Sequence, residues 1–169
     1  MRSTTLTDRS IPQPTATPKL PPRWFIRAAW AAHRAIYRYT DGRRGLALPQ
    51  GPGGKFGLMR LKTTGRRSGT ERAAILGYVE DGANLVTLAM NGWAEKDPAW
   101  WLNLRALPHA RVELKGGTNR HVRAREAAGE ERERLWTLVQ SHSGYGNDIS
   151  AFARRRSGET AVVVLEPRT

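Results

Sequence analysis

A tight-turn signal in the middle of the chain most constrains its fold. Asp81-Gly82 lies between two stretches of strand-forming residues, Ala73–Val79 and Ala83–Met90. An Asp-Gly pair flanked by such stretches is the strongest short-range signal for a β-hairpin. The sequence therefore predicts an antiparallel hairpin here, and any fold for this chain must contain it.

Other short strands are expected on both sides of this hairpin. The expected strands lie at residues 56–61, 73–79, 83–90, 111–115, 121–126 and 159–165. The expected helices lie at residues 97–107, 129–141 and 147–155, and Asp97 is the predicted N-cap of the first. Strands and helices do not alternate as a parallel sheet requires. The pattern predicts a mainly β fold with helices (α+β), a small antiparallel barrel with helices at its edges.

The first residues differ in composition from the rest of the chain. Residues 1–22 are rich in Pro, Thr and Ser, which predicts a disordered lead-in, and residues 23–169 are long enough for one domain. The start of the chain lacks the apolar segment of a secretory signal. No apolar run approaches the roughly 20 residues that span a bilayer. The chain has no cysteine and its four histidines are scattered, so no metal site is predicted.

Positive charge is concentrated at the front of the chain. Of the net +13, residues 1–72 carry 15 Lys and Arg against three acidic residues, whereas residues 73–169 carry 13 against 12. This asymmetry indicates an anionic partner for the first part. The second part offers no basic face with interleaved aromatic residues, so nucleic acid is not the expected partner.

Residues 23–40 have the pattern of an amphipathic helix. Four arginines at positions 23, 27, 34 and 38 fall within an arc of roughly 60° at 3.6 residues per turn, opposite an apolar, alanine-rich stripe. Two interpretations remain open. The helix lies on an anionic membrane surface, or it packs its small-residue face on the domain's own core.

The connection between the first two expected strands is unusually rich in anion-binding groups. The run Lys62–Arg72 contains four basic residues, two glycines and four hydroxyl residues. Glycine lets backbone N–H groups face a ligand, and guanidinium and hydroxyl groups donate to phosphate or carboxylate oxygens. From this loop alone, an anion-binding cradle and a solvated basic turn remain equally open.

The stretch Ala89–Leu104 combines a strand end, a glycine turn and a helix start. Such a corner exposes backbone N–H groups beside Trp100 and Trp101, which suits a flat heteroaromatic ring. The alternative is that the two indoles are core residues of a short helix. At most one of them is then expected to face the core fully, since neighbours on a helix point about 100° apart.

Three motifs together resemble the deazaflavin-dependent nitroreductase and quinone-reductase family. They are the Thr-Thr-Gly-Arg-Arg-Ser-Gly loop at Thr63–Gly69, the Gly-to-Pro-x-Trp-x-x-Asn-Leu segment at Gly92–Leu104, and the Val-Val-Leu-Glu-Pro end at Val163–Pro167. The resemblance covers about residues 23–167. It implies a split β-barrel of the FMN-binding-like type and the deazaflavin coenzyme F420, with a conventional flavin such as FMN as the alternative cofactor.

The resemblance also implies roles for individual residues. The anionic tail of the cofactor is expected to be bound by Arg66, Arg67, Ser68 and Arg72. The deazaflavin ring is expected to lie against the backbone of Leu88, Ala89, Met90 and Asn91, beside Ala99 and Trp100. Tyr145 and His142 are the candidate proton donors, although His142 could simply end its helix, where the dipole favours it.

The expected reaction is hydride transfer to a planar hydrophobic acceptor. Family nitroreductases carry several tyrosines before the last strand, whereas this chain keeps only Tyr145 there, with Ile149 and Phe152 nearby. A quinone is therefore expected rather than a nitroimidazole. The rival interpretation is a non-catalytic binder of anions or nucleic acid. The predicted location is cytoplasmic, with peripheral contact at the inner face of the plasma membrane, and the sequence does not set the oligomeric state.

Overall fold

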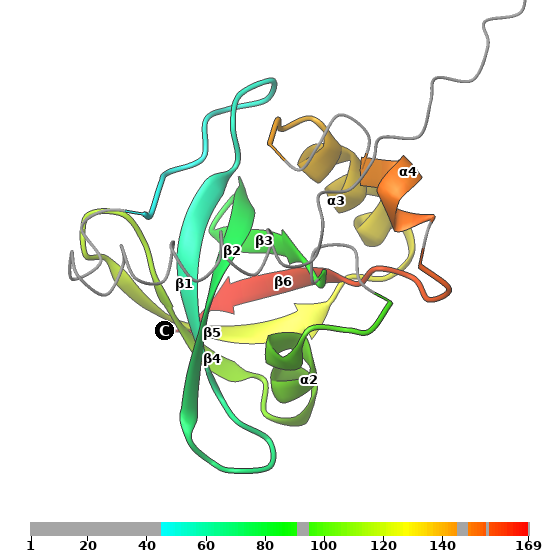
Figure 1. Cartoon of the computed structure of the whole chain (residues 1–169). Helices are drawn as coiled ribbons and strands as arrows, with labels where there is room; N and C mark the ends of the chain where they lie inside the picture. Colours follow the sequence, from blue (N-terminus) through cyan, green and yellow to red (C-terminus); the bar gives the residue numbers. More distant parts are fainter. Residues whose placement is uncertain (1–44, 91–94, 145–148, 155, 169) are drawn as a thin grey trace, which may run out of the picture.

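A computed structural model describes residues 45–90, 95–144, 149–154 and 156–168 (Figure 1). Within these residues six antiparallel strands close into a barrel in the order β1-β2-β3-β6-β5-β4. The strands are β1 (Gly57–Thr64), β2 (Glu71–Asp81), β3 (Asn84–Leu88), β4 (His109–Glu113), β5 (Asn119–Glu126) and β6 (Val162–Pro167). The helices are α2 (Ala99–Ala106), α3 (Gly129–Gln140) and α4 (Ile149–Ala153). The predicted barrel is confirmed.

Short hairpins make three of the six strand pairings in the barrel: β1–β2, β2–β3 and β4–β5. The Asp81-Gly82 turn forms as predicted between β2 and β3, and Gly82 has φ 61°. The barrel closes where Arg60–Thr63 of β1 pair with Ala110–Glu113 of β4. Closure supplies each of these strands with a hydrogen-bonded neighbour on both sides, as β-ladders require.

Alternation along the strands divides the core in two. Inward-facing residues such as Met59, Leu61 and Leu165 fill the barrel and are fully buried. A second cluster, including Val79 and Val86, packs between the outside of the barrel and α3 with α4. Side chains on opposite faces of a strand thus serve two different cores.

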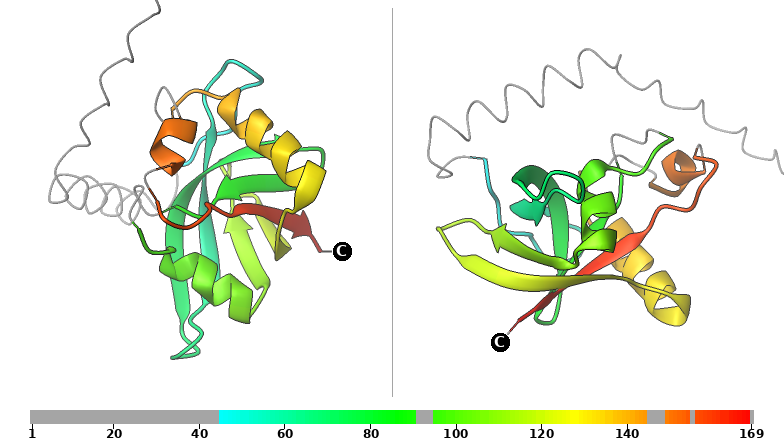
Figure 2. Two further views of the ribbon diagram at one scale, coloured as in Figure 1. Left: turned by 90° about the vertical axis from the view of Figure 1, so that its right-hand side faces the viewer. Right: turned by 90° about the horizontal axis from the view of Figure 1, so that it is seen from below.

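The helices lie at different ends of the barrel. Figure 2 shows α3 and α4 together at one end and α2 at the other. α2 packs against β1, β2 and β5, whereas α3 packs against β2, β3 and β6. The loop between β1 and β2 projects from the end that carries α2 (Figure 1).

Two local predictions are wrong. Asp97 does not cap α2: the N-cap residue is Pro98, whose side chain makes no capping hydrogen bond. The Asp97 carboxylate is instead occupied by Arg156, at 2.9 Å. Trp100 and Trp101 are both buried, at 8% and 4% exposure, because α2 packs against three strands and so buries more than one side.

The predicted lead-in and the predicted helix at 23–40 lie outside the described residues. Among the residues that are described, no helix combines the length and apolar character needed to cross a membrane.

Candidate functional site

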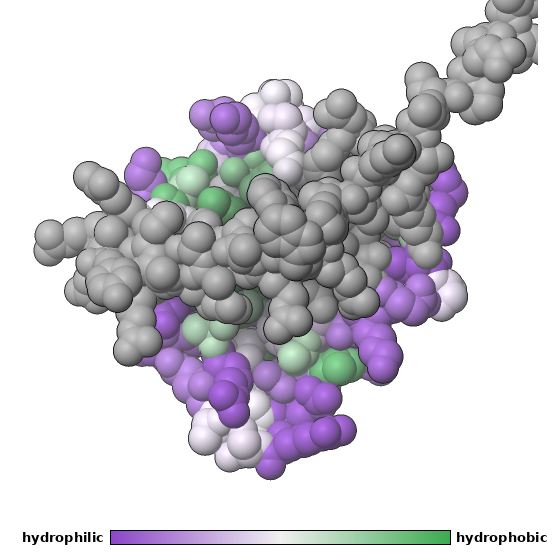
Figure 3. Space-filling view, in the orientation of Figure 1, coloured by the Kyte–Doolittle hydropathy of each residue, from purple (hydrophilic) through white to green (hydrophobic). Residues whose placement is uncertain are grey.

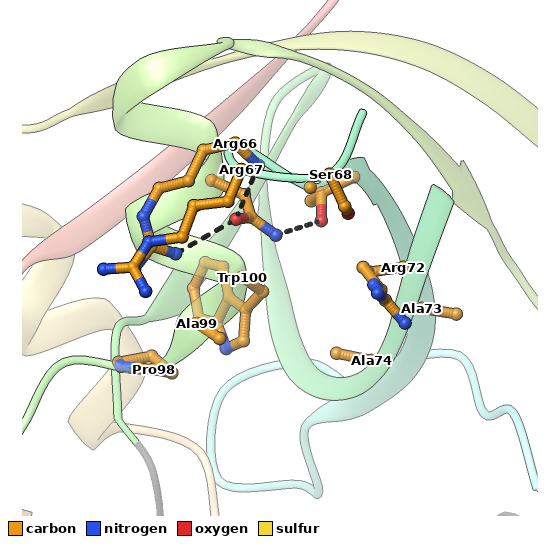
Figure 4. A pocket seen from close by; sticks show the side chains of 12 residues that line it. Arg66, Arg67, Ser68, Arg72, Ala73, Ala74, Pro98, Ala99 and Trp100 are labelled. Carbon is orange, nitrogen blue, oxygen red and sulfur yellow. Dashed lines mark hydrogen bonds between the residues drawn. The ribbon is translucent and has the colours of Figure 1, made fainter. Parts of the chain in front are cut away.

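A pocket of about 510 Å³ opens between the β1–β2 loop and the start of α2. Its walls come from the end of β1, the loop, the start of β2 and one side of α2 (Figure 4). The lining residues are Thr63, Gly65, Arg66, Arg67, Ser68, Arg72, Ala73, Ala74, Pro98, Ala99, Trp100 and Asn103.

The loop is a compact turn that closes on itself. Gly65 N–H donates to the Thr70 carbonyl at 2.8 Å, and Gly69 N–H donates to the Gly65 carbonyl at 2.8 Å. Gly69 has φ 66°, a conformation that side chains rarely adopt. A Cβ on Gly65 would lie 2.8 Å from Ser68 Oγ. Glycine at both positions therefore permits a turn tight enough to present its arginines outward.

Asn103 ties this loop to the barrel. Its side-chain oxygen accepts from both the backbone N–H and the Nη1 of Arg66, each at 3.2 Å. Its amide nitrogen donates to Thr63 Oγ1 at 3.2 Å. Asn103 is 5% exposed and Thr63 is 2% exposed, so the bond between these two side chains is shielded from water, whereas the bonds to Arg66 are part-buried. Figure 4 shows these bonds linking loop, helix and strand.

The described residues leave the positive charge around the pocket without a neutralising carboxylate. Arg66, Arg67 and Arg72 are exposed, and the ion pairs between described residues involve none of the three. The nearby carboxylate of Glu71 pairs with other cations, Lys62 at 3.9 Å and Arg111 at 3.5 Å. In Figure 3 hydrophilic (purple) and neutral (white) residues share the lower end of the view, where this loop lies. The rim is therefore suited to an anion.

The inner wall of the pocket is apolar and aromatic. Trp100 lines it and also packs with Trp101 in the core cluster, with ring centroids 6.3 Å apart and an interplanar angle of 59°. Arg66 and Arg67 run side by side near Ala99 and Trp100, and Arg72 lies on the other side of the pocket (Figure 4). A cationic rim beside an aromatic wall can accommodate a ligand with an anionic part and a flat ring.

The structure brings six of the predicted cofactor residues together here: Arg66, Arg67, Ser68, Arg72, Ala99 and Trp100. Leu88, Ala89 and Met90 are not among the lining residues of this pocket. The N–H groups of Ala89 and Met90 donate to the carbonyls of Ala161 and Leu88, at 2.9 and 2.8 Å. Asn91 lies outside the described residues. The ring-binding role of residues 88–91 stays a prediction.

Of the two candidate proton donors, the structure describes only His142. Tyr145 lies outside the described residues. His142 follows the C-cap of α3, is 7% exposed, and its Nδ1 lies 2.9 Å from the Leu138 carbonyl. Since a carbonyl only accepts, Nδ1 carries a proton and donates it there. His142 is not among the residues that line the pocket. This contact supports the helix-ending alternative, and the catalytic role of either residue stays a prediction.

Sequence reasoning missed two residues that organise this region. Asn103 was noted only as a member of the Pro-x-Trp-x-x-Asn-Leu motif. No neighbouring residue indicated that it bonds to the β1–β2 loop. Arg156 belongs to the run Arg154-Arg155-Arg156, which has the pattern of a solvated basic segment. In the structure its side chain is 2% exposed. No local signal distinguishes it from its neighbours.

Comparison with known proteins identifies the class to which this fold and pocket belong. The family model described as F420H(2)-dependent quinone reductase matches residues 30–167. The F420H(2)-dependent quinone reductase Rv1261c of Mycobacterium tuberculosis is 33% identical over 139 residues, covering 80% of this chain and 88% of the relative.

Two solved structures are similar at 28% identity. One is an F420-H2 dependent reductase (FDR-A), with a TM-score of 0.57 over 64% of this chain and 93% of the other. The second, described as a domain-swapped dimer, has a TM-score of 0.59 over 86% of this chain and 100% of the other.

Fold and site define a split-barrel oxidoreductase. The chain belongs to the family of F420H(2)-dependent quinone reductases. This membership confirms the resemblance inferred from the three motifs, the split-barrel fold class, the oxidoreductase class and coenzyme F420 as the cofactor of the family.

Proposed function

We propose that this chain binds coenzyme F420 in the pocket between the β1–β2 loop and α2, and reduces a quinone-type acceptor with it. The observation that carries the proposal is a rim of three exposed guanidinium groups beside the indole of Trp100. The guanidinium groups suit the phosphate and oligoglutamate tail of the cofactor, and the indole suits its planar ring.

The donor set fits the cofactor's tail. Arg66 and Arg67 supply charged donors and Ser68 supplies a hydroxyl from one turn whose shape is set by hydrogen bonds within it. Arg72 adds a third guanidinium from the start of β2. Ala99 and Trp100 form the wall on which the ring packs. Met90 and Asn91, after β3, complete the ring site in this proposal.

The chemistry that reduced F420 supplies is hydride donation to an electron-poor acceptor. The chain contributes by binding the cofactor and the acceptor, orienting their two flat rings, and excluding water around them. A proton is also needed at the product oxygen. His142 does not line the pocket, and its Nδ1 donates to the Leu138 carbonyl. The phenol of Tyr145 is therefore the favoured donor.

The test is a titration of the full chain with F420, with FMN as the control ligand. Each charge-assisted bond contributes about 1.5–3 kcal/mol, so Arg66→Ala or Arg67→Ala should weaken F420 binding about tenfold or more. Arg123→Ala is the matched control, because Arg123 is exposed on β5 and does not line the pocket. It changes the net charge equally and should leave the affinity within about twofold.

Other outcomes would decide against the proposal. Unchanged F420 affinity in the Arg66→Ala/Arg67→Ala double variant would remove the loop from the cofactor site. Preferential FMN binding would favour the conventional flavin. Steeply salt-dependent DNA binding without retention of any cofactor would favour the non-catalytic alternative. Faster turnover with nitroimidazoles than with menadione-like quinones would overturn the choice of acceptor.

The proposal has a second part, which concerns location. We infer a cytoplasmic enzyme that contacts the inner face of the plasma membrane through residues 23–40. The arginine stripe of that segment supports this inference, because anionic lipid attracts it. A lipophilic quinone would then reach the enzyme from the bilayer.

A further inference from the structure

Arg156 is a buried arginine that lies between α4 and β6 and does not line the pocket. Its side chain is 2% exposed. A buried guanidinium loses its hydration, so its donors must find partners within the protein. Nη1 donates to the Ala89 carbonyl at 3.1 Å and to Thr160 Oγ1 at 3.0 Å. Nη2 donates to the Glu95 carbonyl at 3.4 Å and to Asp97 Oδ1 at 2.9 Å.

Three of these four partners lie at the two ends of the segment that joins β3 to α2. Ala89 directly follows β3, whereas Glu95 and Asp97 directly precede the N-cap of α2. Ala89 N–H also donates to the Ala161 carbonyl, at 2.9 Å. The segment between α4 and β6 therefore holds Ala89 through both its N–H and its C=O.

A neighbouring contact strengthens the second attachment. Ser157 N–H donates to Glu95 Oε1 at 3.0 Å, and the Ser157 hydroxyl bonds the same oxygen. These two bonds, and then the charge of Arg156, hold the pKa of the Glu95 carboxyl below its usual range. The carboxylate thus stays ionised and bonded to Ser157 at neutral pH.

The second attachment point leads straight into the pocket. Pro98, Ala99 and Trp100, which follow Asp97, line its wall. We propose that Arg156 is a positioning residue that holds this wall in a fixed relation to the end of β3. The inference rests on the proposed function, which places the cofactor ring against both segments. Arg156 acts through Ala89, Glu95 and Asp97, not by contact with the ring.

The chemistry of the side chain suits this role. A guanidinium is a rigid planar fork that can bond two carbonyls, a hydroxyl and a carboxylate at once. A lysine ammonium is a single point of charge and cannot span the same four partners. The hydrogen bonds of Arg156 do not include the β1–β2 loop, which binds the tail in our proposal. Ring alignment and tail affinity are therefore separable by mutation.

The first experiment needs no cofactor. Hydrogen exchange of the full chain is compared for wild type, Arg156→Lys and the control Arg105→Lys. Arg105 is a matched control because it also pairs with the Asp97 carboxylate, with 4.0 Å between Nη1 and Oδ2, but its side chain is 60% exposed. Arg156→Lys should speed amide exchange in residues 95–101 severalfold and leave residues 65–72 unchanged, whereas Arg105→Lys should change neither. Equal exchange in all three proteins would overturn the positioning role.

The second experiment measures F420 affinity and menadione turnover in the same proteins. A small misplacement of the cofactor ring relative to the acceptor strongly lowers the rate of hydride transfer. Arg156→Lys should therefore lower kcat at least tenfold while the Kd for F420 stays within about threefold. Asp97→Asn, which keeps the other three bonds, should show a smaller loss of kcat with the same unchanged Kd. If Arg156→Lys does not fold, as judged by its thermal midpoint, Asp97→Asn decides the matter alone.

A purely structural role gives a different pattern. It would lower the thermal midpoint and the folded fraction but leave kcat per bound cofactor unchanged, and that result would overturn the inference. A wild-type chain that does not bind F420 would overturn the proposed function instead. Hydrogen exchange would still report whether Arg156 holds residues 95–101, so the two failures are distinguishable.

Discussion

Asn103 illustrates how one buried amide organises an exposed binding loop. It satisfies two donors of Arg66 and reaches Thr63 on β1. Without it, the backbone N–H of Arg66 would lose its partner and the loop would lose its attachment to α2. The arginine would then have to be ordered by the ligand itself, which costs affinity.

We expect Asn103→Ala to weaken F420 binding about five- to tenfold, corresponding to the roughly 1 kcal/mol of a hydrogen bond. The comparison is Thr63→Val, which removes one bond of the network but leaves both Arg66 contacts intact, and should cost less than half of that free energy. Fluorescence titration measures both. Equal losses in the two variants would show that Arg66 is not the residue through which Asn103 acts.

Tyr78 is a residue whose polarity serves no bond within the described part of the chain. Its ring is fully buried in the barrel, and its hydroxyl finds no partner among the described residues. Burial, followed by the charge of Glu80, raises the pKa of Tyr78 to about 12. The folded chain therefore favours the neutral phenol more than the unfolded chain does.

This shift predicts a pH dependence. An unfolded tyrosine ionises near its ordinary pKa of 10.0, so stability from this group is complete below pH 10 and is lost as the pH rises towards about 12. Tyr78→Phe should show no such loss, and at pH 7 it should raise the free energy of unfolding by up to about 1 kcal/mol, since it removes an unpaired buried hydroxyl. Urea denaturation at pH 7 and pH 10.5 measures both effects. A variant that is less stable at both pH values would mean that the hydroxyl has a partner.

At the scale of elements, the β1–β2 loop depends on its backbone shape as much as on its charges. Gly69 has a positive φ and open space around its Cα. Gly69→Val should weaken F420 binding at least tenfold because a β-branched residue strains this conformation and distorts the turn. Gly69→Asn should keep most of the affinity, since asparagine tolerates the left-handed region. Calorimetric titration of both variants tests this, and equal behaviour would show that turn shape is unimportant.

The turns were predictable because their chemistry is local. Asp81-Gly82 and the Thr63–Gly69 loop were both recognised from adjacent residues, although β1 extends to Thr64 and β2 begins at Glu71, which shortens the loop. The N-cap of α2 was mistaken because it depends on Arg156, 59 residues further along the chain. The bond between Asn103 and Thr63 joins residues 40 positions apart, and the local sequence around neither residue indicates it.

The two tryptophans show the same limit at the level of packing. Helical spacing places Trp100 and Trp101 about 100° apart. Only the arrangement of β1, β2 and β5 around α2 reveals that both directions are covered. Periodicity therefore gives the angle between side chains, and tertiary structure decides which angles are buried.

For the whole molecule, the uneven charge makes a prediction about membranes. If residues 23–40 lie on lipid, each of four arginines should contribute about 1 kcal/mol on an anionic surface, declining with salt. The full chain should then co-sediment with anionic vesicles at low salt and not with neutral ones, and a chain lacking residues 1–40 should bind neither. No binding of the full chain to anionic vesicles would rule out the membrane role. Loss of solubility on truncation would favour a helix packed on the barrel.

The closed barrel also limits how two copies of this chain could join. Each described strand already has a neighbour on both sides, so none offers a free edge to which another copy could add a strand. Pairing between copies through backbone bonds would first require a seam to open. The β1–β4 and β3–β6 seams each hold four residue pairs and join segments far apart in sequence, so they are the natural places for such an exchange. An assembly of intact barrels must instead rely on side chains, which makes it sensitive to surface substitutions and to ionic strength.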